Sequence, residues 1–426
     1  MPSARSGATA PSRGEPSRGG SSGGGSSLGP GRTAYAGGWH ARRVTERHAI
    51  LTVWESGFDW SPGADVDHTD VHVEGAVAVT FASRVWESPV VELPFAATEL
   101  IPSWNARTPA GTWLLVEGRV GEEDVWGPWF TFARWAEDDP TGESPVTRTT
   151  VRDQHLESGR VETDTWLAAP GHGVERWQLR LTALALPCDE IVWPTVTLVA
   201  GAASRFDIRP DEPTSVRGVG RGSEVAVPPH SQRLHVDTFP EWDNGGQSWC
   251  SPTSTTMLLE HWGRGPEPDE VAWVGHAVDP EVVHAVRRVF DRAYGGAGNW
   301  AFNTAYAGSR GLRAYVTRLR DLGEAEAFVA AGVPLVVSVT FREDELDGAG
   351  YATSGHLLTI VGFTAEGDVV SNDPNSHRIA SNDEVRTVYA REQFERVWLG
   401  SDGGLAYVMH PRDVALPAPP SEPNWV

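Results

Sequence analysis

Residues 244–254 read NGGQSWCSPTS and contain Cys250, one of only two cysteines in a chain of 426 residues. Pro252 is tolerated in the first turn of a helix, and Met257, Leu258 and Trp262 follow at helical spacing before Gly263 ends the pattern. The stretch therefore predicts a helix that begins at the cysteine. A thiol at a helix N-terminus lies near the positive end of the helix dipole, which favours the nucleophilic thiolate. The alternative is an inert buried cysteine.

A nucleophilic cysteine needs a general base, and the base needs a group that orients it. His356 stands at the head of the apolar run SGHLLTIVGF, which predicts a strand, and Asn372 and Asp373 end the next strand in VVSNDPN. Two antiparallel strands can align such a histidine with the carboxylate. Taken singly, His356 is also explained as a strand-end histidine and Asp373 as a turn residue. The order Cys, His, Asp or Asn is that of papain-like enzymes.

These motifs resemble a known family. WCSPTSTTML with the preceding Gly-Gly, GNWAFNTAYA, SGHLLTIVGF and SNDP are similar to the actinobacterial branch of the papain-like cysteine peptidases, whose best-known relatives are the leader-cleaving domains of bacteriocin exporters, the C39 peptidases. The likeness covers residues 227–410. It implies a papain-like fold with Cys250 as nucleophile, His356 as general base and then acid, and Asp373 as the group that orients His356.

The resemblance also implies an oxyanion hole made of the cysteine backbone N–H and a glutamine side chain upstream of it. Gln232, in PPHSQR, matches the Ser-Gln element of the family and is the preferred candidate. Gln247, in GGQSWC, is closer in sequence and is the alternative. One such preorganised donor contributes about 3 to 4 kcal/mol to stabilising the transition state.

The N-terminal half has a different pattern. TWLLVEGR (112–119) and RWQLRLTA (176–183) alternate apolar and polar residues, as half-buried strands do. Several such segments without helical periods predict a β-sandwich of the jelly-roll kind. PSWNARTPAGTWLLVEGR also resembles the extra domain that accompanies these peptidases. Three tryptophans cluster in this half: Trp126, Trp129 and Trp135. We interpret their role as packing in the core and between paired strands, and the alternative is that they stack on sugar rings.

The fold class that follows is α+β, with an N-terminal β-sandwich followed by a papain-like peptidase domain. In the second domain we expect helices at 252–263, at 281–294 and ending near Gly332, a buried strand at 333–341, and an antiparallel pair formed by HLLTIVGF and DVVSND. The predicted divisions are a disordered Ser/Gly-rich leader (1–38), a β-sandwich (39–208), a linker (209–226), a peptidase domain (227–412) and a Pro-rich tail (413–426).

Charge and composition exclude several classes of function. The formal charge of −22, without a basic stripe, argues against nucleic acid and anionic membranes as partners. Every strong base is an arginine, so a P-loop lysine and a Schiff-base lysine are excluded. Two cysteines make no disulfide framework or CxxC metal site, and we expect no cofactor and no metal. Without a visible signal h-region or a membrane span, we expect a soluble protein. Its location stays open: it is cytoplasmic as written, and secreted if it is exported by an unseen route or if the start is misassigned.

The sequence thus predicts a cysteine-type peptidase that hydrolyses a peptide or related amide through a thioester. The expected partner is a peptide or protein substrate. Two alternatives stay open: a non-catalytic binding protein for peptide or cell-wall polymer, in which the N-terminal domain contacts carbohydrate, and an acyl or amide transferase that uses the same residues.

Overall fold

The computed structural model of the chain describes residues 47–68, 78–122, 124–137, 146–206, 218–275 and 277–426. All of these residues belong to one compact unit. The predicted leader, residues 1–38, lies outside the described residues, and so does the first half of the predicted linker. The boundaries proposed from the sequence stay predictions.

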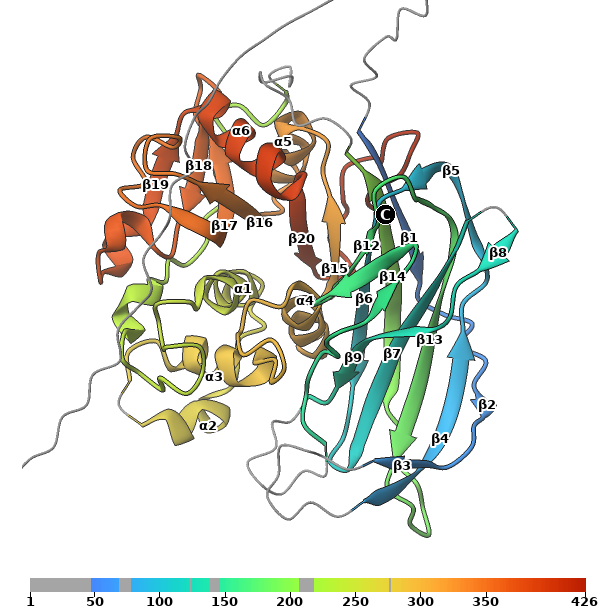
Figure 1. Ribbon diagram of the computed structural model, residues 1–426. Coiled ribbons are helices and arrows are strands. Elements are labelled where there is room, and N and C mark those ends of the chain that lie inside the picture. The colour runs from blue at the N-terminus through green and yellow to red at the C-terminus, as the bar shows by residue number, and fades with distance from the viewer. Residues whose placement is uncertain (1–46, 69–77, 123, 138–145, 207–217, 276) are drawn as a thin grey trace, which may run out of the picture. The chain divides into compact units, whose positions relative to one another are not determined.

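The described N-terminal half consists of strands in two antiparallel sheets (Figure 1). The first sheet contains, in spatial order, β1 (His48–Trp54), β14 (Thr195–Arg205), β6 (Glu99–Arg107), β12 (Thr165–Ala168), β11 (Gly159–Glu162) and β10 (His155–Leu156). The second contains β2 (Ser61–Pro62), β4 (Val79–Glu87), β13 (Val174–Ala185), β7 (Thr112–Glu122) and β8 (Val125–Trp126), joined by β3 (Val66–His68), β5 (Val91–Ala97) and β9 (Phe130–Trp135).

The two sheets share one hydrophobic core. Trp177 of β13 packs on β14 at Gly201, where a Cβ atom would lie 2.4 Å from its ring, and it also meets Trp54 of β1 edge to face. β7 and β13 pair side by side and are buried on both faces over most of their length, so they are more buried than the alternating pattern predicted. The jelly-roll arrangement stays a prediction.

The tryptophans divide into two groups. Trp135 is fully buried, as the packing interpretation requires. Trp126 and Trp129 are half-buried, and the guanidinium groups of Arg119, Arg176 and Arg180 stack on their rings. Their faces are therefore occupied by arginine.

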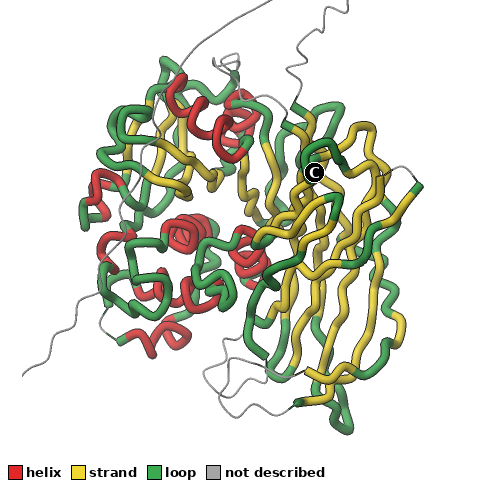
Figure 2. Tube along the Cα trace, in the orientation of Figure 1, coloured by secondary structure: helices red, strands yellow, loops and turns green. Residues whose placement is uncertain are grey.

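The C-terminal half combines a third antiparallel sheet with helices (Figures 1 and 2). The strand order is β15 (Arg313–Arg318), β20 (Leu405–His410), β16 (Leu335–Phe341), β17 (Thr353–Phe363), β18 (Val369–Asn372) and β19 (Arg386–Tyr389). The helices are α1 (Cys250–His261), α2 (Pro268–Val271), α3 (Pro280–Val289), α4 (Trp300–Ser309), α5 (Leu322–Ala330) and α6 (Arg391–Asp402). Short 3₁₀ turns lie at Gln232–His235, Ala272–Val274, Ser376–Arg378 and Asn382–Glu384.

Most of the predicted elements are present. The predicted helix after Cys250 is α1, the helix near Gly332 is α5, and the predicted antiparallel pair is β17 with β18. The predicted helix 281–294 is too long, because α3 ends at Val289 and Phe290 leaves the helical conformation. The cause is Asp291, whose carboxylate accepts from the backbone N–H groups of Ala293 and Tyr294 and so closes a turn.

The two halves are joined by hydrogen bonds from buried side chains of the N-terminal half. The side-chain amide of Asn105 in β6 donates to the carbonyl of Ala314 in β15 at 2.8 Å and accepts from its N–H at 3.0 Å. Arg148 is fully buried and donates to the carbonyls of Arg287 and Phe290 at the end of α3. The side chain of Asn105 therefore satisfies backbone groups of the third sheet that would otherwise be buried without a partner.

The predicted Pro-rich tail packs against both halves. The N–H of Leu51 in β1 donates to the carbonyl of Pro423, and the side chain of Asn424 donates to the carbonyl of Arg318 in β15. Trp425 is buried against Phe328 of α5.

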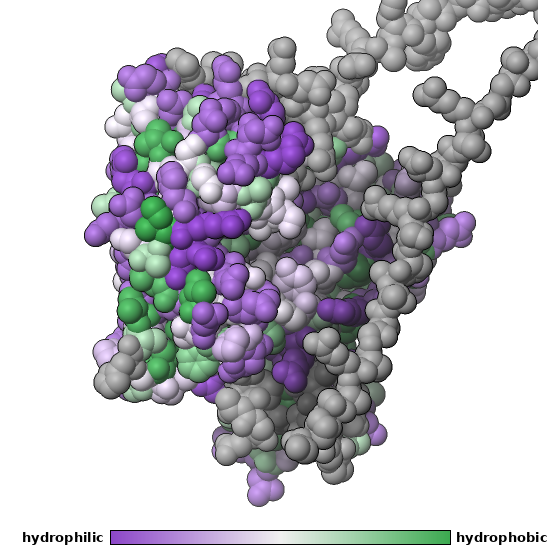
Figure 3. All heavy atoms as spheres, turned by 60° about the vertical axis from the view of Figure 1, so that its left-hand side comes forward, coloured by the Kyte–Doolittle hydropathy of each residue, from purple (hydrophilic) through white to green (hydrophobic). Residues whose placement is uncertain are grey.

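Hydrophilic residues predominate on the face shown in Figure 3, with apolar residues scattered between them. Among the helices that the structure describes, none is long and apolar enough to cross a membrane.

Candidate active site

Cys250 is the first residue of α1 and is 9% exposed. The helix is buried on all sides from Cys250 to Leu259, so its hydroxyl residues need partners within the protein. Ser251 bonds to the hydroxyl of Tyr407 in β20, and Ser254 donates to the carbonyl of Leu357 in β17. These bonds fix the start of α1 against the strands that carry the other candidate residues.

His356 lies in β17 and Asp373 directly after β18, and the pairing of these strands brings the two side chains together. Nε2 of His356 lies 2.8 Å from Oδ1 of Asp373. The imidazole is 3% exposed, lines the same cavity as Cys250 and interacts with its thiol. Because Nε2 faces the carboxylate, Nδ1 is the nitrogen left for the sulfur. The structure thus brings the three sequence-predicted residues into one chain of contacts.

Burial acts against the charged forms of His356 and Asp373, but their interactions outweigh its effect on both pKa values. Burial alone would lower the pKa of His356, but the charge of Asp373 and the hydrogen bonds to Asp373 and Cys250 outweigh it and raise that pKa to about 10. Burial would raise the pKa of Asp373, but the charge of His356 and hydrogen bonds, including that of Tyr389, lower it. The pair is therefore an imidazolium and a carboxylate near neutral pH.

Two tyrosines that the sequence did not single out complete the surroundings of Asp373. The hydroxyls of Tyr351 and Tyr389 donate to Oδ2 at 2.8 and 2.6 Å, and the N–H of Asn375 donates to Oδ1 at 2.9 Å. The ring of Tyr351 also meets the ring of His356 edge to face. No spacing rule identifies these tyrosines, although Tyr351 stands only five residues before His356.

The two glutamine candidates lie in the same cavity but in different settings. Gln232 is 2% exposed, and its Nε2 donates to the carbonyl of Gln247 at 3.0 Å, whereas the side chain of Gln247 is exposed. The N–H of Gln232 donates to the carbonyl of Pro374, next to Asp373. The segment that carries Gln232 is therefore attached to the loop that carries Asp373.

A network around His230 holds this segment from the other side. The imidazole of His230 lies 2.8 Å from Glu260 at the end of α1 and 3.2 Å from Asp279. Burial opposes its charge, but the carboxylates of Asp279 and Glu260 raise its pKa to about 9. The network fixes the chain two residues before Gln232.

The side chains of Cys250 and His356 line a cavity of about 780 Å³. Other walls of the cavity come from the loop before α1, the start of β17, the loop after Asp373, and the loop before α4 with the first residue of that helix; they include Ser248, Tyr294, Trp300, Ser354 and Arg378. Glu162 of β11 also lines it, so the N-terminal half reaches this cavity. Among the described residues no group of three or more His, Cys, Asp or Glu side chains is arranged to hold a metal ion.

The cavity lining does not include Trp249, His377 or Cys188. Trp249 is fully buried and donates from its indole N–H to the carbonyl of Trp242, so it packs beneath the helix start. His377 is exposed on the loop after Asp373. Cys188 is exposed and, like Cys250, is a free thiol.

Comparison with known proteins identifies a family for this chain. Residues 39–204 match the sequence model of the Peptidase C39 N-terminal domain, and residues 224–404, which contain the site, match that of the Peptidase_C39 like family. Among solved structures, a candidate C39-like peptidase from Bacillus anthracis is similar at 19% identity, covering 45% of this chain and 99% of its own, with a TM-score of 0.27. No curated protein matches the chain. The chain belongs to the C39-like peptidase family.

Proposed function

We propose that the protein is a cysteine-type peptidase that hydrolyses a peptide or related amide through a thioester. One observation carries the proposal: the imidazole of His356 joins the thiol of Cys250 to the buried carboxylate of Asp373 at the wall of a cavity. A nucleophile, a base and an orienting group in contact are the arrangement that activates a cysteine.

In the first step the Cys250 thiolate attacks the substrate carbonyl carbon and a C–S bond forms. The positive charge on His356 and the N-terminus of α1 stabilise the thiolate. His356 then transfers its proton to the leaving nitrogen, the C–N bond breaks, and the amine departs. The product of this step is an acyl thioester on Cys250 and a neutral imidazole.

In the second step water attacks the thioester, and His356 accepts a proton from it. The C–S bond breaks, the carboxylic acid product leaves, and the proton on His356 restores the imidazolium–thiolate pair. Asp373 keeps the ring oriented in both steps, because the ring N–H at Nε2 donates to it throughout.

Negative charge develops on the substrate oxygen in both steps and needs a donor. We assign this role to the backbone N–H of Cys250 and the side chain of Gln232. Gln232 is the better candidate because its amide is buried and held by the carbonyl of Gln247, whereas the exposed Gln247 side chain would have to be ordered first.

The test is alkylation of Cys250 by iodoacetamide in a Cys188→Ser background, which removes the exposed second thiol. At about pH 6 an ordinary thiol is mostly protonated, so Cys250 should react at least about tenfold faster than a free cysteine. The rate should fall toward that of the free thiol in His356→Ala. Equal rates for Cys250 and free cysteine, unchanged by His356→Ala, would refute an activated nucleophile.

Mass spectrometry of products formed from a synthetic peptide mixture separates the open alternatives. A hydrolase gives fragments with a new carboxylate and a new amine, whereas a transferase joins the acyl fragment to an added amine. A binding protein gives neither. Cys250→Ala supplies the control, because any product that persists in it arises elsewhere.

A further inference from the structure

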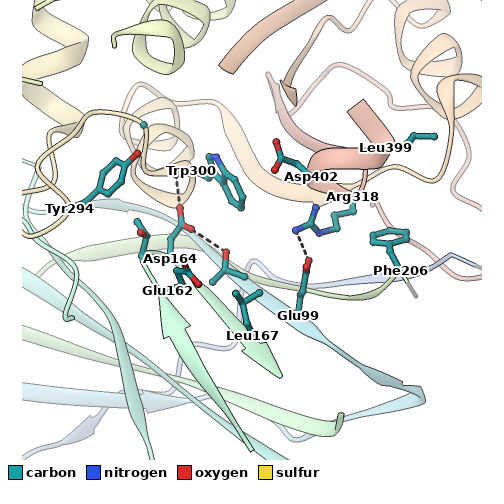
Figure 4. Close-up of a pocket in the computed structure, with 14 residues that line it drawn as sticks. Glu99, Glu162, Asp164, Leu167, Phe206, Tyr294, Trp300, Arg318, Leu399 and Asp402 are labelled. Carbon is teal, nitrogen blue, oxygen red and sulfur yellow. Dashed lines mark hydrogen bonds and ion pairs between the residues drawn. The ribbon is translucent and has the colours of Figure 1, made fainter. Parts of the chain in front are cut away.

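A second cavity, of about 350 Å³, is shown in Figure 4, and it adjoins the cavity that Cys250 lines. The two share five lining residues, which are Glu162, Tyr294, Gly298, Trp300 and Asp402. A substrate chain that lies over Cys250 can therefore extend into this second cavity, which we call the side compartment.

The N-terminal half supplies as many residues of the side compartment as the peptidase half does. The turn between β11 and β12 places Glu162, Thr163 and Asp164 at its wall, and Leu167 and Glu99 follow from β12 and β6 (Figure 4). Asp164 is held in place because its Oδ2 accepts from the N–H groups of Trp300 and Ala301, the first residues of α4. The N-terminal half thus forms part of the wall next to the catalytic cavity.

The side compartment has an excess of carboxylates. Glu99, Glu162, Asp164 and Asp402 line it, against the single guanidinium of Arg318, which pairs with Glu99. The carboxylate of Asp402 accepts from Ser338 at 2.6 Å, which orients it at the boundary with the Cys250 cavity. Within the described residues the side chain of Glu162 forms an exposed ion pair with Arg160, and such a pair costs little to rearrange.

A donor without a partner also points to a ligand. Arg318 is 4% exposed, and its Nε–H is buried with no hydrogen-bond partner among the described residues. A buried donor left without an acceptor is costly, and a carbonyl oxygen of a bound chain would satisfy it.

The remaining walls of the side compartment are apolar or aromatic. Trp300, Phe206, Leu167 and Leu399 line it beside the carboxylates. Such walls suit the methylene stem of a long side chain, while the carboxylates and aromatic faces suit a positive charge at its end.

We propose that the side compartment binds a cationic group of the substrate, an ammonium or guanidinium, on a chain whose carbonyl accepts from Arg318. The cation is either a lysine or arginine side chain or a free α-amino group. This assignment rests on the proposed function, because it places the cation on the peptide that Cys250 attacks. Glu162 and Asp402 are then specificity-determining residues.

Disulfide tethering tests the side compartment without requiring catalysis. The Cys188→Ser protein is equilibrated, in the presence of β-mercaptoethanol, with disulfides of matched length that end in an ammonium, a hydroxyl or a carboxylate group. Intact mass measures how much of each probe Cys250 retains. At one or more chain lengths the ammonium probe should be retained about threefold to tenfold more than the hydroxyl probe, and the carboxylate probe least.

The preference for the ammonium probe should fall in Glu162→Gln and in Asp402→Asn, and fall further in the double variant. Asp189→Asn is the matched control: it also removes one negative charge, at an exposed position outside both cavities. Equal retention of ammonium and hydroxyl probes at every length, or a preference that survives the double variant, would overturn the proposal.

Cleavage of peptides identifies the source of the cation. If a side chain is bound, cleavage sites in a synthetic peptide mixture will show lysine or arginine at one fixed position, with no effect of N-terminal acetylation. If the α-amino group is bound, acetylation will abolish cleavage a fixed number of residues from the N-terminus. If no peptide is cleaved, the proposed function fails, and tethering alone decides whether the side compartment prefers a cation.

Discussion

The charge state of His356 determines at which pH the His356–Asp373 pair stabilises the fold. A histidine pKa raised from 6.5 to about 10 contributes stability that is complete below pH 6.5 and is lost as the pH rises toward 10. The lowered pKa of Asp373 contributes stability that is present above its ordinary value of 3.8 and is lost as the pH falls below it. The pair therefore stabilises the protein most between these two limits.

Asp373→Asn should lower the free energy of unfolding by about 3 kcal/mol near pH 6, because it leaves a buried imidazole without its counter-charge. The loss should shrink as the pH approaches 10, because His356 of the wild type then begins to lose its proton. Urea denaturation at about pH 6 and about pH 9 measures it, with Asp189→Asn as the exposed control. A loss that does not depend on pH would mean that packing, and not charge, is what the substitution removes.

Gln232 and Gln247 provide a second test at the scale of single residues. If Gln232 donates to the oxyanion, Gln232→Ala should lower kcat by about 10²- to 10³-fold with little change in KM, because the bond forms only in the transition state. Gln247→Ala should change kcat by less than about threefold. Steady-state kinetics on one cleaved peptide decides between them, and the reverse ranking would reassign the donor to Gln247.

The sequence predicts Cys250, His356 and Asp373 as candidate site residues because each marks the end or start of a strongly patterned element. It does not identify Tyr351 or Tyr389, since a hydroxyl that donates to a distant carboxylate leaves no periodic signal. The same holds for Glu162, which reaches the cavity from a strand more than eighty residues before Cys250. Contacts of this kind depend on tertiary packing, which local patterns do not encode.

At the scale of elements, the position of α1 against β17 sets the geometry between Cys250 and His356. α1 was predictable from its proline, its apolar spacing and Gly263, and β17 and β18 from their apolar runs. The end of α3 was not, because a buried aspartate side chain, and not the helix pattern, closes the turn there. Element type follows from periodicity, whereas an end fixed by a side-chain bond does not.

Ser254→Ala tests the contact between α1 and β17. Its hydroxyl donates to the carbonyl of Leu357, next to His356, so its loss should cost about 1 to 3 kcal/mol of stability and lower kcat more than it changes KM. The matched control is Thr256→Ala, whose hydroxyl bonds only to the carbonyl of Pro252 within α1. The control should lose stability without the fall in kcat. Equal effects on kcat would mean that the contact does not position the site.

At the scale of the whole molecule, a carboxylate from one half caps a helix of the other. Asp164, in the turn between β11 and β12, is buried and accepts from the first two backbone N–H groups of α4. Asn299 caps the next N–H of the same helix, from Phe302, as expected of a local N-cap. The sequence shows the local cap, but no pattern reveals the second one, which comes from a residue 136 positions earlier.

The pH dependence of this cap has a definite sign. Burial raises the pKa of Asp164 to about 6, and the hydrogen bonds from Trp300 and Ala301 only partly oppose it. An aspartate pKa raised in the folded state favours the protonated form there, so stability is lost as the pH rises from 3.8 toward 6. The loss is about 3 kcal/mol, which is the free energy of a shift of about two pKa units.

Asp164→Asn should therefore stabilise the protein at neutral pH. The amide oxygen can still accept from the N–H groups of α4, and the amide group can donate to the hydroxyl of Thr165, but no buried charge remains. In thermal denaturation, Asp164→Asn and the wild type should be equally stable near pH 4, and the variant should be the more stable protein by about pH 6. Asp164→Ala should destabilise the fold at every pH, because two helix N–H groups lose their acceptor. If Asp164→Asn is instead less stable than the wild type at neutral pH, the helix N-terminus requires the full negative charge, and its dipole outweighs the cost of burial.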